Sequence, residues 1–243
     1  MTGVDLWLID ADQPPEVAAR LWRTLDADER ARAERADAGR RSRFTVVRGA
    51  VRELVAARLG IGPAELVWRY GPQGKPEPVG AGGLRVNWST AEPLAVLALA
   101  EGRAVGVDVE PLRDARRAER MAARWFPFEE ARFVAEPAEP GERAARFTAL
   151  WCRREACVKA YGGRLVQALG VSVAGHSPLL LADPGPLGAG PVGLCDVPVP
   201  GPYRAAVATV GGCPDQVNSV VWSPHWWTIR TVGPFWTITG SRW

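Results

Sequence analysis

The sequence predicts an α+β protein built from two related halves. Long helical segments alternate with short β-branched runs, and this mixture predicts the class. A short internal echo predicts the halves, because Arg-Phe-Thr occurs at 43–45 and again at 146–148. Each copy lies near the start of a long helical segment that stops at a glycine. We therefore expect two pseudo-symmetric α/β halves.

The expected first half opens with a strand at residues 4–9, followed by helices at 15–25, 27–38 and 41–59. Pro14 and Pro15 open the first of these helices, and Gly60 supplies the C-terminal stop of the last. Residues 69–83 are rich in glycine and proline, which predicts an ordered loop or series of turns. A loop of that kind commonly holds a ligand.

Two apolar runs follow, at 85–100 and 104–110, with the turn signal Glu-Gly-Arg between them. Their β-branched content predicts that they pair as a hairpin. The pattern becomes helical again from residue 127 and, after a break at 137–141, predicts a second long helix that ends at Gly162. Residues 165–210 predict further short strands.

We place the halves at residues 1–103 and 104–210, which leaves 211–243 as a separate segment. This segment holds five of the 11 tryptophans and almost no charge. Its composition is compatible with an extra β-rich appendage, a partner-binding tail or a non-native extension.

Composition narrows the classes of protein to consider. Hydrophobic residues make up 47% of the chain and charged residues 23%, which is typical of a soluble globular protein. The first residues lack the pattern of a signal peptide, and no stretch approaches the roughly 20 apolar residues that span a bilayer. We expect a cytoplasmic protein without a membrane anchor.

The cysteines and histidines do not predict a metal site, a disulfide framework or histidine-based catalysis. The four cysteines form no CxxC pair, which predicts buried thiols rather than a zinc site or a disulfide framework. The chain has two histidines, His176 and His225, and both lie in loop-like or tail segments. Proton chemistry therefore falls to carboxylates, lysine or water.

Asp108 and Glu110 are two apart in a predicted strand, so both carboxylates point to one face. Two such groups in an apolar strand repel each other and cost free energy unless a cation joins them. Mg²⁺ suits this arrangement, because it binds one or two protein carboxylates together with phosphate and water. The alternative is an exposed strand face that pairs with arginines.

Glu155 and Lys159 are four apart in the second long helix and lie on one helix face. Glu followed by Lys at this spacing is also a common solvent-exposed pair, so the pair gains meaning only in combination with other motifs.

The combination resembles a known family. GVDVE at 106–110 and WCRREACVK at 151–159 resemble the signature of the Sfp-type 4′-phosphopantetheinyl transferases, G[IV]D[IVL]E and WxxKExxxK. VNWST at 86–90 resembles the family's FN(L/I)SHS strand, and GKP at 74–76 resembles the loop before it. Arg43 falls on the arginine-bearing helix of the first half.

The resemblance implies a magnesium-dependent enzyme that moves the 4′-phosphopantetheine arm of coenzyme A to a serine of an acyl or peptidyl carrier protein, releasing 3′,5′-ADP. The active site would lie between the halves. Asp108, Glu110 and Glu155 would surround Mg²⁺. Glu155 would also deprotonate the carrier serine, directly or through water, and Lys159 would stabilise the leaving nucleotide.

The resemblance also implies a coenzyme A site. Lys75 and Arg43 would hold the phosphates of the 3′-phosphoadenosine end, Ser89 would donate a hydrogen bond to phosphate, and Pro76 would shape the adenine pocket. Thr90 stands where the family usually has a phosphate-contacting histidine, which predicts weaker binding of coenzyme A.

Arg154 replaces the lysine that usually precedes the glutamate, which keeps the charge but changes reach and geometry. Together, Thr90 and Arg154 support an alternative interpretation. In it, the protein is a weak or inactive homologue that binds coenzyme A or a carrier protein without turnover.

The arginines between 30 and 52 form a basic cluster. The basic cluster is compatible with a solvated helix face. It is equally compatible with a surface that binds coenzyme A or an acidic carrier. Nucleic-acid binding is a third reading, but the net charge of +3 is small and no aromatic platform accompanies the cluster. We expect no nucleic-acid partner. We also expect a monomer, because one chain supplies both sides of the cleft.

Overall fold

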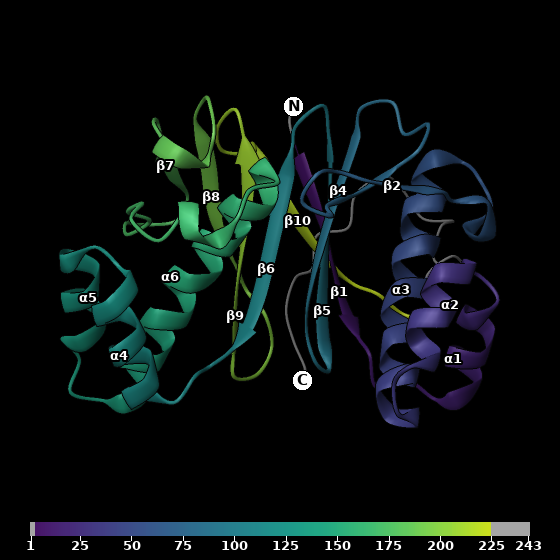
Figure 1. The fold of residues 1–243 in the computed structure, drawn as a ribbon, viewed down its shortest axis with the longest axis horizontal. Helices are drawn as coiled ribbons and strands as arrows, with labels where there is room; N and C mark the ends of the chain where they lie inside the picture. Colours follow the sequence, from purple (N-terminus) through teal and green to yellow (C-terminus); the bar gives the residue numbers. More distant parts are fainter. Residues whose placement is uncertain (1–2, 225–243) are drawn as a thin grey trace.

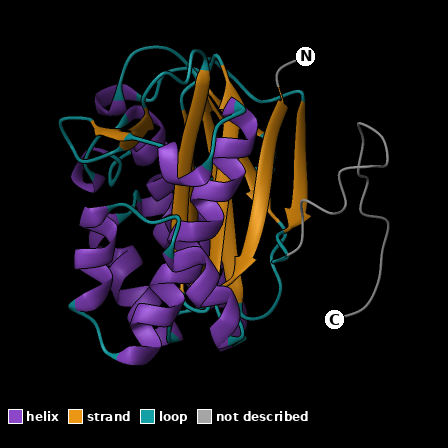
Figure 2. Ribbon diagram, turned by 90° about the vertical axis from the view of Figure 1, so that its right-hand side faces the viewer, coloured by secondary structure: helices purple, strands orange, loops and turns teal. Residues whose placement is uncertain are grey.

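The computed structural model describes residues 3–224 and confirms an α+β fold. Two four-stranded sheets run through the middle of the molecule, with α1–α3 beside one sheet and α4–α6 beside the other (Figure 1). Seen from the side, the helices lie mainly on one side of the strands (Figure 2). Among the described helices, none is long and apolar enough to cross a bilayer.

The first sheet has the strand order β10-β1-β5-β4, with β10 parallel to β1 and the other neighbours antiparallel. Its strands are β1 (Gly3–Asp10), β4 (Leu84–Ala91), β5 (Leu94–Glu101) and β10 (Gln216–Val221). Its helices are α1 (Pro15–Trp22), α2 (Ala27–Glu34) and α3 (Ala38–Leu59). A small antiparallel pair, β2 (Trp68–Tyr70) and β3 (Pro76–Pro78), lies within the segment expected to be an ordered loop.

The second sheet has the order β6-β9-β8-β7 and is antiparallel throughout. Its strands are β6 (Val105–Pro111), β7 (Leu179–Leu181), β8 (Val192–Val197) and β9 (Tyr203–Val210). Its helices are α4 (Ala115–Trp125), α5 (Phe128–Ala135) and α6 (Pro140–Tyr161).

Each sheet packs one face on its own helices and the other on a core shared with the second sheet. Along β5, Leu97 and Leu99 pack in the helix-facing core, while Val96 and Ala98 pack in the shared core. The shared core also receives Val107 and its neighbours two residues away in β6. Because β5 is buried on both faces, its sequence is a continuous apolar run instead of an alternating one.

The expected hairpin between 85–100 and 104–110 is wrong. The first run contains both strands of a hairpin, β4 and β5, which turn at Glu92 and Pro93. The second run, β6, pairs with β9 in the other sheet. The Glu-Gly-Arg turn therefore connects two sheets, and β4 meets β6 through a side chain, since Val107 N donates to Asn87 Oδ1 (2.8 Å).

Helix α4 was not expected from the sequence, although it carries a recognisable start signal. The Asp114 carboxylate accepts a hydrogen bond from Arg117 N (3.0 Å) and caps the helix. Ala115, Ala118 and Ala122 form its buried face. Alanine makes a helix easily but contributes little to an apolar pattern, so the periodicity is weak.

The long helices of the two halves are built alike. Both α3 and α6 have 22 residues, and both end at a glycine in the left-handed region, Gly60 (φ +71°) and Gly162 (φ +68°). The threonines of the Arg-Phe-Thr echo, Thr45 and Thr148, each donate to the carbonyl four residues earlier (2.8 Å). The echo thus lies in similar parts of two similar helices, one residue out of register when the helices are aligned on Gly60 and Gly162.

Strand β10 lies in the segment expected to be a separate tail. It pairs with β1, and the Trp222 indole is buried against the helices of the first half, with Trp222 N donating to Leu8 O (2.8 Å). The division into 1–103, 104–210 and 211–243 stays a prediction. Residues 225–243, with four of the segment's five tryptophans, lie outside the described residues.

Candidate active site

Helix α6 crosses strand β6 at Gly106 with no side chain between the two backbones. A Cβ placed on Gly106 would lie 2.1 Å from Ala156 O and 2.3 Å from Ala160 N. Only glycine permits this approach. The crossing brings the face of α6 that carries Glu155 and Lys159 close to the polar face of β6.

Three motif residues from three elements form a hydrogen-bonded hub. Lys159 Nζ from α6 donates to Asp108 Oδ1 in β6 (2.6 Å) and to Ser89 Oγ in β4 (3.0 Å). Ser89 Oγ in turn donates to Asp108 Oδ1 (2.8 Å). Asp108 is 3% exposed, and its second oxygen, Oδ2, is buried without a hydrogen-bond partner among the described residues.

Glu110 and Glu155 lie close enough to Asp108 to feel its charge. Burial raises the pKa of Glu155, and the neighbouring Asp108 and Glu110 carboxylates raise that pKa further. Burial and Asp108 likewise raise the pKa of Glu110, although Arg113 Nη2 donates to Glu110 Oε2 (3.1 Å) and lowers it. The site therefore holds three carboxylates, two of which are harder to ionise than usual.

No group of three or more His, Cys, Asp or Glu within residues 3–224 has the geometry of a metal site. Two cationic side chains of the chain itself contact the carboxylates, Lys159 at Asp108 and Arg113 at Glu110. The donor set nevertheless fits a hard divalent cation, because it consists of carboxylate oxygens. The buried, unpartnered Asp108 Oδ2 and the mutual repulsion of the carboxylates both favour an additional positive charge.

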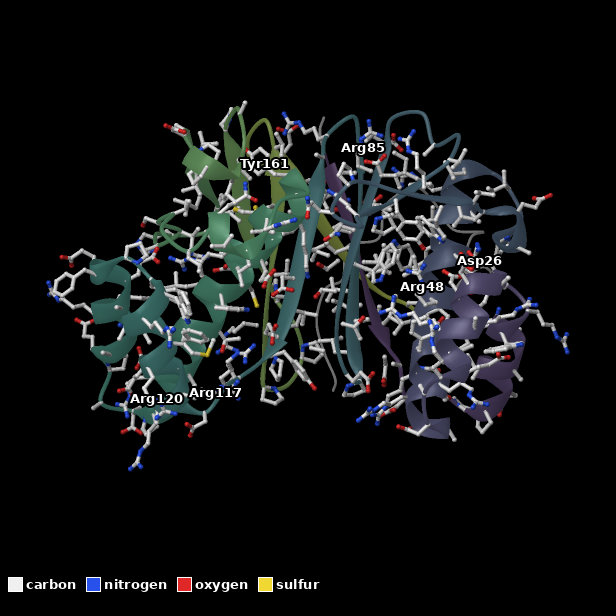
Figure 3. The ribbon with its side chains drawn as sticks, viewed as in Figure 1. Asp26, Arg48, Arg85, Arg117, Arg120 and Tyr161 are labelled. Atoms are coloured by element: carbon white, nitrogen blue, oxygen red, sulfur yellow. The ribbon has the colours of Figure 1, made fainter. Side chains whose placement is uncertain are left out.

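A pocket of about 420 Å³ opens between the halves, lined by the start of β4 and the end of α6. Figure 3 shows Arg85 and Tyr161 at the same end of the molecule, one from each half, and both line the pocket. Lys75 lines it too, and its ammonium donates to Val105 O (2.9 Å) and Ala160 O (3.1 Å). Burial lowers the pKa of Lys75 to about 8.

The structure does not bring Arg43 and Lys75 together. Arg43 pairs with Asp12 (2.7 Å) and Glu92 (3.3 Å), beside the turn that follows β4. Lys75 lies at the opposite end of β4, next to Leu84 and the start of β6. One phosphate cannot contact both cations in this arrangement, because β4 separates them.

Pro76 and Thr90 are the remaining predicted binding residues. Pro76 is half-buried and begins β3, directly after Lys75, while Thr90 is exposed near the end of β4. Cys152 lies on α6 close to Asp108, but burial raises its thiol pKa well above the usual value, so the thiol stays protonated.

Arg154 does not face the site. Its side chain is 0% exposed and pairs with Glu130 of α5, on another side of α6 from Glu155. The change in reach and geometry from lysine to arginine therefore acts on the contact with α5, and its effect on activity stays a prediction.

Sequence reasoning missed three contributors to the site. Asn87 joins β4 to β6, Gly106 allows α6 to approach, and Arg113 pairs with Glu110 while its guanidinium lies 5.6 Å from the Trp151 ring. Asn87 and Gly106 both lie inside the motifs VNWST and GVDVE, and this position could have marked them as parts of the site.

Comparison with known proteins agrees with this geometry. A family model described as the 4′-phosphopantetheinyl transferase superfamily matches residues 104–180, which include β6 and α6. The 4′-phosphopantetheinyl transferase HetI of Nostoc sp. is 31% identical over 229 residues, covering 92% of this chain and 91% of HetI. The chain belongs to the 4′-phosphopantetheinyl transferases.

A second relative supports the assignment of this transferase. The Synechocystis sp. protein slr0495, whose name assigns it provisionally to the same activity, is 31% identical over 160 residues. That match covers 65% of this chain and 64% of slr0495. As a family member, the transferase moves phosphopantetheine, takes coenzyme A as its substrate and acts on carrier proteins.

Proposed function

We propose that the transferase uses Mg²⁺ and that the hub of Ser89, Asp108 and Lys159, with Glu110 and Glu155 beside it, is its reaction centre. The observation that carries this proposal is the contact of Lys159 Nζ with both Asp108 Oδ1 and Ser89 Oγ. It joins residues of three sequence motifs, from both halves, at one point.

Asp108, Glu110 and Glu155 would hold the magnesium ion. When bound, Mg²⁺ neutralises charge on the pyrophosphate of coenzyme A. The unpartnered Asp108 Oδ2 supports a ligand role for that residue. Arg113 competes for Glu110, so metal binding requires this largely buried ion pair to rearrange.

Glu155 would accept the proton of the carrier serine, directly or through water, as the serine oxygen attacks phosphorus. A carboxylate with a raised pKa is a stronger base than an ordinary one, and the pKa of Glu155 is raised by burial and by its neighbours. Lys159 would stabilise the charge that develops on the 3′,5′-ADP leaving group as the bond to it breaks.

The coenzyme A nucleotide would occupy the pocket lined by Lys75, Arg85 and Tyr161. Lys75 supports this proposal because its present partners are two neutral carbonyls, so a phosphate would bind it more strongly. Pro76 would border the adenine, and Ser89 would donate to phosphate.

Arg43 and Thr90 would contact the cofactor nearer the turn that follows β4. Arg43 is the weaker phosphate ligand of the two cations, because Asp12 and Glu92 already neutralise it. Thr90 would supply a neutral hydroxyl, so binding of coenzyme A should be weaker than with histidine there.

The test is a transfer reaction followed by mass spectrometry. The chain, coenzyme A, Mg²⁺ and an apo carrier should give a carrier heavier by one phosphopantetheine arm, and chelation of Mg²⁺ should abolish the gain. Apo acyl and peptidyl carriers are tried in parallel to identify the preferred class. Full transfer in the presence of chelator would contradict the metal requirement.

We also propose that the protein is cytoplasmic. We further propose a monomer, since both sides of the site come from one chain. Light scattering of the purified protein measures the oligomeric state directly. A weak or inactive homologue keeps Thr90 as its support near the site, whereas Arg154 lies outside the site and could affect turnover only indirectly.

A further inference from the structure

Arg154 occupies a junction that holds helix α6 from the side away from the reaction centre. We infer that Arg154, acting through Glu130, is a positioning residue that sets the direction of Glu155 and Lys159. This inference rests on the proposed function, because it takes those two residues as the reacting groups.

The junction joins three parts of the second half. Glu130 of α5 pairs with Arg154, and its Oε1 accepts from Val173 N (2.6 Å), Ala174 N (2.8 Å) and Ser172 Oγ (3.1 Å). Arg154 Nη2 also donates to Val171 O (3.1 Å). Helix α6, helix α5 and the loop at 171–174 are thereby tied to one buried ion pair.

The guanidinium of Arg154 has little freedom to move. Its central carbon lies 3.9 Å from the centroid of the Phe126 ring, and its Nη1 donates to Leu150 O (3.3 Å). Arg154 and Glu130 are 0% and 2% exposed, so water cannot replace these contacts without opening the core.

This junction restrains rotation of α6 about its own axis. Successive residues of an α-helix point about 100° apart, so holding Arg154 in one direction also determines the direction of Glu155. At the crossing with Gly106 the helix meets bare backbone, which gives close approach but no interlocking side chain. Rotational restraint therefore comes from side chains elsewhere on α6, where Arg153 pairs with Asp196 (2.7 Å) and Arg154 pairs with Glu130.

The first half contains an equivalent junction that serves as an internal control. Arg52 stands eight positions before Gly60, as Arg154 stands eight before Gly162. Arg52 is also 0% exposed, and its Nε donates to Glu29 Oε2 (2.7 Å). Glu29 is the third residue of α2, as Glu130 is of α5.

The two junctions differ in what they could position. Figure 3 shows Asp26 and Arg48, which belong to the Arg52 junction, on the α2–α3 side of the molecule. The residue after Arg52 is Glu53, which pairs with Arg20 of α1 and not with the hub. The Arg52 junction thus contains a similar buried arginine–glutamate pair, and its nearest approach to the hub is Arg48, whose guanidinium lies 4.4 Å from the ring of Trp88, the residue before Ser89.

The experiment compares Arg154→Met with Arg52→Met in the full chain. Both variants should lose thermal stability. Only Arg154→Met should lose kcat per folded molecule, by about ten- to a hundredfold, the cost of misplacing a reacting group by about 1 Å. Its KM and calorimetric Kd for coenzyme A should stay within about threefold of wild type, because the Lys75 pocket is untouched.

Two further sets of variants cover the case in which an orphaned buried charge prevents folding. The neutral pair Glu130→Gln/Arg154→Met removes both charges and should repeat the loss of kcat. In the first half, Arg52→Met leaves Glu29 paired with Arg48, so the control needs no second substitution. Arg154→Lys retains the charge and should recover a large part of the lost kcat, as a general loss of packing would not.

The inference is overturned if folded Arg154→Met turns over like wild type, or if Arg52→Met loses as much kcat. It is equally overturned if coenzyme A affinity falls in step with kcat. A wild-type chain that transfers nothing to any carrier rejects the proposed function itself, and the positioning role with it.

Discussion

The proposed reaction centre gathers more negative charge than its own cations neutralise. Three carboxylates, Asp108, Glu110 and Glu155, face the two cations Lys159 and Arg113, and burial raises the pKa of both glutamates. A carboxyl with a raised pKa favours the folded state when protonated, and this stability is lost as pH rises through the raised pKa. At neutral pH the site is therefore a source of instability.

Glu155→Gln should raise Tm at neutral pH in the presence of a chelator, because the amide removes an ionised group from the cluster. The gain should shrink as pH falls toward the ordinary glutamate pKa, where wild type becomes protonated as well. Differential scanning calorimetry across this range measures both effects. Glu129→Gln, at an exposed carboxylate on α5, is the control and should change Tm little. A lower Tm for Glu155→Gln would contradict the charge argument.

Lys75 should give the reaction an alkaline limit. Its pKa is lowered to about 8 by burial, so the ammonium loses its charge above that pH. If this charge attracts the nucleotide phosphates, kcat/KM for coenzyme A should fall as pH rises through about 8, because kcat/KM follows the free enzyme. Lys75→Arg stays charged and should flatten the profile. A wild-type profile without a decline there would exclude this role.

At the scale of elements, the crossing of α6 over β6 decides the geometry of the site. Because a Cβ on Gly106 would overlap the α6 backbone, strand and helix can meet only at a glycine. Strand β6 cannot relax easily, since it is also hydrogen-bonded to β9 along its length.

Gly106→Ala should push α6 away from β6 and separate Lys159 from Asp108. We expect a loss of at least about 1–3 kcal/mol in the free energy of unfolding, as for overpacked cores, and a larger relative loss of kcat. Urea denaturation and carrier labelling measure the two quantities. The control is Gly141→Ala in the first turn of α6, where a Cβ meets nothing within 4 Å and alanine favours the helix. Wild-type kcat in folded Gly106→Ala would refute the crossing argument.

The two halves are interleaved along the chain. Strand β10 follows the second half in sequence yet pairs with β1, and Trp222 is buried in the first half's core at 2% exposure. The shared core between the sheets adds residues from both halves. We therefore expect the halves to unfold together.

Trp222→Ala should destabilise the protein by about 3–5 kcal/mol, the usual cost of truncating a buried aromatic side chain. The loss should appear as one cooperative transition, with the fluorescence and circular dichroism midpoints shifted together. Trp125→Ala, at an indole that is 40% exposed, is the matched control and should change the free energy of unfolding by about 0.5 kcal/mol or less. Two separated transitions in the Trp222 variant would show that the halves unfold independently.

Local patterns in the sequence determined much of this protein. The long helices and their glycine stops follow from periodicity and from the left-handed conformation that glycine permits. The shared face of Asp108 and Glu110 follows from the two-residue period of a strand. The motifs around Asp108 and Glu155 led to the transferase family, which the similarity to HetI confirms.

Which elements meet depends on contacts that the sequence patterns do not reveal. The tertiary structure paired β6 with β9 instead of β5, joined β10 to β1, and placed Arg43 and Lys75 at opposite ends of β4. It also turned Arg154 toward Glu130, although Arg154 adjoins Glu155 in sequence. These outcomes depend on contacts between residues far apart in the chain, and periodicity describes only neighbours, so it does not specify them.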